Sequence, residues 1–128
     1  MVRFGRAVLV GVVPLLASLL VAAPARAAQA EVTVSSVYAA AADRLEVYGT
    51  ATCTEPTGTA HVTVMATQVM PFSFGWVGLD VPCAGGLVYW EASVLGGYGW
   101  QNWSQVTVNA NLTDSQGGAD DFSGVFTA

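Results

Sequence analysis

Basic side chains are nearly absent from this sequence. It contains no lysine, and only one of its four arginines, Arg44, lies beyond residue 30. All nine acidic residues lie beyond that point, so the side-chain charge of residues 31–128 is 1 − 9 = −8 with His61 neutral. Nucleic acids and anionic lipid surfaces are excluded as partners, because binding to either depends on lysine and arginine. Any electrostatic preference is for cations or basic surfaces.

Groups that catalyse reactions are also scarce. His61 is the only histidine, and no serine stands in a G-x-S-x-G context. General acid–base and nucleophilic catalysis both require a positioned group of this kind. Nothing in the sequence brings the carboxylates Glu91, Asp120 and Asp121 together as a glycosidase pair would require. We therefore predict that the protein is not an enzyme and that it carries no cofactor.

Acidic residues gather around one turn, "DSQGGADD" at 114–121, where Asp114, Asp120 and Asp121 could offer oxygen ligands to calcium. The segment lacks the alternating aspartate spacing of a calcium-binding loop, and aspartate and glycine are also ordinary turn residues. We predict no metal site, and calcium at this turn is the open alternative.

Residues 1–27 are predicted to be a secretory signal peptide, with cleavage as late as residue 30 as the alternative. Two arginines give a positive start, an apolar run follows at 7–23, and small-x-small cleavage sites stand at 25–27 and 28–30. A transmembrane anchor needs about 20 apolar residues, which is more than this run supplies. We therefore expect a secreted, extracellular protein that is not attached to a membrane after cleavage.

Cys53 and Cys83 are the only cysteines. An even number of cysteines in a secreted protein predicts disulfides, and two cysteines allow a single pairing. The bridge would close a loop of about 30 residues and stabilise the fold by roughly 3–4 kcal/mol. A metal pair or a redox site is the alternative, but the sequence has neither a CxxC spacing nor a second histidine.

Beyond residue 30, apolar residues alternate with a period of two, which is typical of strands with one buried face. We predict short strands with turns about every ten residues, at 31–37, 44–53, 60–69, 72–83, 87–95, 103–113 and 122–127. The run "YAAAADRL" at 38–45 is too short for a stable helix and is predicted to make a turn. The expected fold is one all-β domain at 31–128, an antiparallel immunoglobulin-like β-sandwich of about seven strands with one disulfide.

The alternation also assigns individual residues to faces of these strands. Trp90 is in register with neighbouring valines and is predicted to lie in the core, as are Phe122 and Phe126 in the last strand. His61 alternates out of register with the valines of its strand, so it is predicted to lie on the outer face.

Three segments carry a resemblance to a known group: "EVYGTATC", then "VPCAGG" with Trp90 seven residues after the cysteine, then "VTVNANLTDSQGG". They resemble small, secreted actinobacterial domains that have an immunoglobulin-like sandwich and no assigned function. The resemblance covers residues 31–128 and implies a Cys53–Cys83 disulfide and a core position for Trp90. The arrangement of cysteines and tryptophan in true immunoglobulin domains is not implied.

A second similarity is to the apoproteins of enediyne chromoproteins, which are also small, acidic, secreted sandwiches of seven strands. They begin with "VTV"-type strands, as residues 32–34 do here, and end in hairpins rich in glycine and aspartate. The similarity implies a carrier for a small hydrophobic ligand. Those proteins use two disulfides, whereas this chain can form one.

The segment "GGYGWQNWSQ" at 96–105 is the predicted contact site, with Tyr98, Trp100 and Trp103 as its binding residues. Aromatic rings beside amides suit stacking on a carbohydrate or anchoring of a protein partner. The alternative is a loop whose rings cap the end of the sandwich. Glycines break the strand register at Tyr98 and Trp100, whereas Trp103 is predicted to begin a strand on its outer face.

These observations favour a non-enzymatic module that binds a partner or decorates the cell exterior, and they leave its oligomeric state open. One alternative is a carrier of a small hydrophobic ligand, which would need an apolar cleft between the sheets. Another is an inhibitor of an extracellular enzyme, which would present the aromatic loop on a rigid base.

Overall fold

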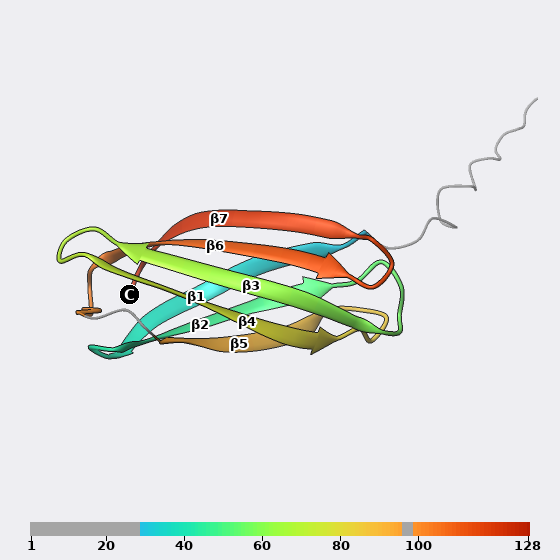
Figure 1. Ribbon diagram of the computed structural model, residues 1–128, viewed down its shortest axis with the longest axis horizontal. Coiled ribbons are helices and arrows are strands. Elements are labelled where there is room, and N and C mark those ends of the chain that lie inside the picture. Colours follow the sequence, from blue (N-terminus) through green and yellow to red (C-terminus); the bar gives the residue numbers. More distant parts are fainter. Residues whose placement is uncertain (1–28, 96–98) are drawn as a thin grey trace, which may run out of the picture.

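The computed structural model describes residues 29–95 and 99–128, which form two packed β-sheets (Figure 1). The elements in chain order are β1 (Glu31–Ala41), β2 (Arg44–Thr52), β3 (Thr59–Gln68), β4 (Ser73–Pro82), β5 (Val88–Leu95), β6 (Gln105–Asp114) and β7 (Ala119–Thr127). One sheet has the order β1-β2-β5 and the other the order β4-β3-β6-β7, with every pairing antiparallel. The predicted all-β antiparallel immunoglobulin-like sandwich with one disulfide is therefore confirmed. The described residues form no helix and thus none that could cross a membrane.

The core lies between the two sheets and is built mainly from valine, with Leu45 and Leu112 fully buried on opposite sheets. Trp90 is buried in it, and Phe122 and Phe126 pack against it with their rings 6.2 Å apart. The predicted core position of Trp90 is confirmed, whereas Phe122 and Phe126 are only partly buried and lie at the margin of the core. Gly49 is required beside Trp90, because an added Cβ would collide with the Trp90 indole and with the Thr33 carbonyl.

The predicted strand boundaries are wrong at three points. β1 continues to Ala41, so the alanines at 39–41 extend a strand and the turn is confined to residues 42–43. β6 begins at Gln105, two residues after Trp103, which lies in the preceding turn. β7 begins at Ala119, so Asp120 and Asp121 belong to a strand, because the turn after β6 needs only residues 115–118.

One end of the sandwich, here called the disulfide end, is held by contacts between the two sheets. The predicted Cys53–Cys83 disulfide is confirmed, and it joins the end of β2 to the end of β4 with Cα atoms 5.6 Å apart. Asp114 in β6 accepts a hydrogen bond from the backbone N–H of Thr54 at 2.7 Å. Asp120 in β7 accepts another from the N–H of Val32 in β1 at 2.9 Å. Sequence elements that are far apart are thereby fixed at one end.

Asp114 is the most constrained carboxylate at the disulfide end. Its Oδ2 accepts the Thr54 N–H, and its Oδ1 accepts the backbone N–H groups of Gln116 at 2.9 Å and Gly118 at 2.7 Å. The Thr54 N–H, then the Thr54 hydroxyl and these turn N–H groups, lower the pKa of Asp114 from 3.8 to about 2. The carboxylate therefore closes the β6–β7 turn and ties it to β2.

Asp114→Asn is expected to lower the free energy of unfolding at neutral pH by about 2 kcal/mol. The substitution removes a charge that the fold stabilises, and it places the asparagine NH2 group next to the Thr54 N–H, so that two donors face each other. A lowered pKa means that this contribution is present above the unfolded value of 3.8 and is lost as pH falls through the folded value of about 2. Urea denaturation at pH 7, 4 and 2 should show wild-type and variant converging as the pH falls. Asp121→Asn, on the outer face, is the control and should change stability by less than about 0.5 kcal/mol. A constant difference at all three pH values would contradict the assignment.

Candidate functional site

Residues 99–105, the described part of the predicted contact segment, lie at the opposite end of the sandwich, and Trp100 is buried there with 3% of its surface exposed. The backbone N–H groups of Gly99 and Trp100 donate to the Ala42 carbonyl, at 2.7 and 3.0 Å, in the turn between β1 and β2. The prediction that Trp100 offers its ring to a ligand is therefore wrong, and the alternative of a cap on the sandwich is confirmed for this residue. Tyr98 lies outside the described residues.

Gln68, which sequence reasoning missed, holds this cap in place. Its side chain is fully buried, donates to the carbonyls of Pro71 at 2.7 Å and Gly99 at 2.8 Å, and accepts the N–H of Gln101 at 3.1 Å. A buried amide needs such partners. The sequence did contain an indication of this role. Gln68 continues the inward-facing series Val62, Val64 and Ala66, where a polar residue is unexpected.

Trp103 behaves differently from Trp100 although both belong to the predicted site. It is 85% exposed, and its backbone adopts φ = 70°, a conformation that costs a non-glycine residue of order 1 kcal/mol. Its N–H donates to the Ala128 carbonyl at 2.6 Å, which holds the turn against the end of the chain. The structure thus separates the two tryptophans into a buried cap and an exposed ring.

A larger aromatic surface lies on the outer face of the four-stranded sheet. Strand register places its outward side chains in cross-strand rows. One row contains Phe74, Thr67, Thr107 and Val125, the next Trp76, Met65, Asn109 and Ser123, and the third Gly78, Thr63, Asn111 and Asp121. We call this surface the aromatic–amide face, defined by Phe74, Trp76, Thr107, Asn109 and Asn111.

The aromatic–amide face combines a stacking platform with polar groups. Trp76 is 62% exposed on the edge strand β4, and Phe74 lies two residues before it on the same side. Across the sheet, the amide of Asn111 donates a hydrogen bond to the Asp121 carboxylate. The strand alternation alone places these side chains outward, but only the strand order β4-β3-β6 brings Trp76 and Asn109 onto one surface.

A hollow of about 280 Å³ lies at one end of this surface, lined by Val69, Met70, Gln105, Thr107 and Val125. Val69 and Met70 come from the turn between β3 and β4 and are strongly exposed, as is Val125 in β7. The hollow therefore has apolar walls on two sides and a polar strand, β6, between them.

The residues considered for catalysis or metal binding take separate positions. His61 lies on the outer face, as predicted, and its Nδ1 lies 2.9 Å from an oxygen of Asp80. Asp114, Asp120 and Asp121 each have a different partner: Thr54, Val32 and Asn111. Within residues 29–95 and 99–128, no three His, Cys, Asp or Glu side chains are grouped so as to hold a metal ion. The arrangement of the aromatic–amide face is suited to non-covalent binding.

The fold and this face define a small immunoglobulin-like β-sandwich with an exposed aromatic surface. The chain matches no protein-family model and no curated protein. Among solved structures it is similar to macromomycin, at 21% sequence identity and a TM-score of 0.43, over 77% of this chain and 99% of that one. A likeness at this level says nothing about what this chain binds.

Proposed function

We propose that this protein is a secreted, non-enzymatic binding module that holds a carbohydrate chain on the aromatic–amide face. The observation that carries the proposal is Trp76, an exposed indole that shares a cross-strand row with Asn109. The N-terminal segment and the disulfide support secretion, because disulfides persist in oxidising compartments.

The chemistry of the face favours a sugar over other ligands. A pyranose ring has an apolar face that can stack on an indole, and hydroxyls that need hydrogen-bonding partners at its edge. Trp76 and Phe74 provide the first, and the side chains of Thr107, Asn109 and Asn111 provide the second. A neutral sugar is also not repelled by the net negative charge of the chain, whereas a nucleic acid would be.

A small hydrophobic ligand is the second candidate, and the hollow beside Val69, Met70 and Val125 favours it. The ligand would lie outside the sandwich, in contrast to the expected cleft between the sheets, because the inward side chains of facing strands, such as Val47 and Val64, are fully buried. A ligand in this hollow would contact Val125 but not Trp76.

Trp76→Ala is expected to weaken binding to the recognised glycan by about tenfold or more, because a well-packed aromatic anchor contributes at least about 1.4 kcal/mol. A glycan array identifies the ligand, and affinity electrophoresis on the matching polysaccharide measures the loss. Trp76→Phe should retain part of the affinity because a ring remains.

Tyr89→Ala is the matched control, since Tyr89 is an exposed aromatic residue on the other sheet. Trp103→Ala, in the same experiment, tests whether the contact surface extends to the turn before β6. The proposal fails if no glycan is bound or if Trp76→Ala binds like the wild type. Loss of a hydrophobic ligand on Val125→Asp, with Trp76→Ala unaffected, would favour the second candidate.

A further inference from the structure

The outer face of the three-stranded sheet carries tyrosines from all three strands. Tyr38 in β1 stacks on Tyr48 in β2, with ring centroids 6.1 Å apart and planes inclined by 13°. Tyr89 in β5 lies on the same face and is 79% exposed. Tyr48 pairs with Glu91 across the two strands, and Tyr89 lies two residues before Glu91, so Tyr48 and Tyr89 are diagonal neighbours. This surface lies on the opposite side of the sandwich from the aromatic–amide face.

A hollow of about 340 Å³ is set into this surface, lined by Ser35, Tyr48, Gly49, Tyr89, Trp90 and Glu91. Gly49 and Trp90 form a cross-strand pair on the buried positions of β2 and β5, so the outer side of this pair presents backbone. The register of β1 shifts at Ser35, whose hydroxyl donates to the Tyr48 carbonyl at 3.1 Å. The bulge at Ser35 and the inward-facing Gly49–Trp90 pair together leave space between Tyr48 and Tyr89.

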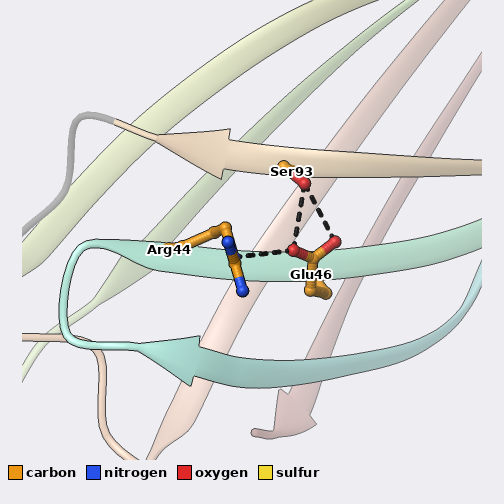
Figure 2. Close-up of polar contacts among 3 residues, drawn as sticks. All are labelled: Arg44, Glu46 and Ser93. Atoms are coloured by element: carbon orange, nitrogen blue, oxygen red, sulfur yellow. Dashed lines mark hydrogen bonds and ion pairs between the residues drawn. The ribbon is translucent and has the colours of Figure 1, made fainter.

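The carboxylates around this hollow are not equivalent. The Glu46 carboxylate pairs with Arg44, whose Nε lies 3.0 Å away, and accepts a hydrogen bond from the Ser93 hydroxyl at 3.0 Å (Figure 2). Arg44 is the only lysine or arginine beyond residue 30, and its side chain is paired with Glu46. The Glu91 side chain is exposed and forms neither an ion pair nor a hydrogen bond within the part of the chain that the structure describes. The hollow thus has one carboxylate that lacks a counter-charge.

Tyr48 lies beside the negative charges of this surface. Its interaction with the Tyr38 hydroxyl is the main cause that raises the pKa of Tyr48 to about 12, followed by desolvation, and the charges of Glu91 and Glu46 add smaller contributions in the same direction. A phenol with this pKa stays protonated and neutral at physiological pH. The ring of Tyr48 is therefore available as a neutral aromatic surface beside the Glu91 carboxylate.

We propose that this hollow binds a small organic cation, a quaternary ammonium group, between Tyr48 and Tyr89 with Glu91 as its counter-ion. Aromatic rings attract large, weakly hydrated cations through their quadrupole, and recognition of quaternary ammonium uses this combination. The single carboxylate suits such a group better than a metal ion, which needs several oxygen ligands. The strongly acidic chain attracts the cation to this surface.

The test uses choline chloride as the probe, titrated at millimolar concentrations and followed by chemical-shift changes in the NMR spectrum of the protein. Saturable binding is expected, with shifts at Tyr48, Tyr89 and Glu91. Tyr89→Ala and Glu91→Gln should each weaken it by about fivefold or more. Both side chains are exposed, so both variants are expected to fold, and thermal melts verify this.

Two controls establish whether the hollow recognises the positive charge of the probe. The neutral carbon analogue of choline, in which tert-butyl replaces trimethylammonium, should bind more weakly than choline, and sodium chloride at equal ionic strength should cause no such shifts. Trp76→Ala should leave choline binding unchanged, so the result is independent of the glycan proposal. The inference is overturned if the neutral analogue binds as well as choline, if Glu91→Gln has no effect, or if no saturable shift occurs.

Discussion

Trp100→Ala is expected to lower the free energy of unfolding by about 3–4 kcal/mol, because it removes a large side chain that is 3% exposed and leaves a cavity at the end of the sandwich. The loss should also free residues 99–101, whose backbone is held by Ala42 and Gln68. Urea denaturation followed by far-UV circular dichroism measures the change without depending on the fluorescence of the deleted indole.

Trp100→Phe distinguishes ring packing from hydrogen bonding. The Nε1 atom of Trp100 is buried and makes no hydrogen bond within the described structure. Removing this donor therefore breaks no bond, and the phenylalanine variant should lose only about 1–2 kcal/mol for its smaller ring.

Trp103→Ala is the matched control in the same loop, and a change within about 0.5 kcal/mol is expected, because Trp103 is 85% exposed. Equal costs for Trp100→Ala and Trp103→Ala would contradict the division of the loop into a buried cap and an exposed ring.

The strand pattern was predictable because burial repeats every second residue. In β6, Val106, Val108, Ala110 and Leu112 are all buried, as their alternation predicts, and their polar neighbours face outward or lie at the margin. The same rule placed Trp90 in the core and His61 outside. Alternation fails at the ends of strands, where glycines and turns remove the period, and the predicted limits of β1, β6 and β7 are wrong there.

The burial of Trp100 could not be predicted from its own neighbourhood. It depends on Ala42 and Gln68, residues that lie 58 and 32 positions earlier (100 − 42 and 100 − 68), and no local pattern links them to the loop. An aromatic loop rich in glycine is consistent with either an exposed tip or a cap. The buried amide of Gln68 decides between them, because two of its three partners, Gly99 and Gln101, lie in this loop and are reached only when it is folded back.

The two outer faces illustrate a further limit of sequence reasoning. Alternation places Trp76 and Asn109 on outer surfaces, but only the order β4-β3-β6 brings them into one row. The tyrosine hollow likewise needs the β2–β5 pairing and the register shift at Ser35. Residue types could be assigned to a face, whereas their combination into a site required the pairing of strands.

Replacing both cysteines, Cys53→Ala with Cys83→Ala, is expected to lower the free energy of unfolding by about 3–4 kcal/mol. The bridge closes a loop with a sequence separation of 30, and its loss returns the corresponding entropy to the unfolded chain. For a domain of roughly 100 residues this is a large share of a total stability of about 5–15 kcal/mol. Thermal and urea unfolding of the wild type with and without reductant should show the same difference as the double variant. A change below about 1 kcal/mol would contradict the expected contribution of this bond to the stability of the fold.

The disulfide and Asp114 should act together rather than independently. Thr54, which follows Cys53 directly, donates its N–H to Asp114, so both contacts tie the end of β2 to the four-stranded sheet. Without the bridge, the Thr54–Asp114 hydrogen bond is a remaining tie between the segment after β2 and the four-stranded sheet, and Asp114→Asn should then cost more than in the wild type. Residues that share a structural element in this way show coupling energies of about 0.5–3 kcal/mol in double-mutant cycles. A cycle of Asp114→Asn with the cysteine pair measures the coupling at pH 7, and strict additivity would mean that the two contacts hold the disulfide end separately.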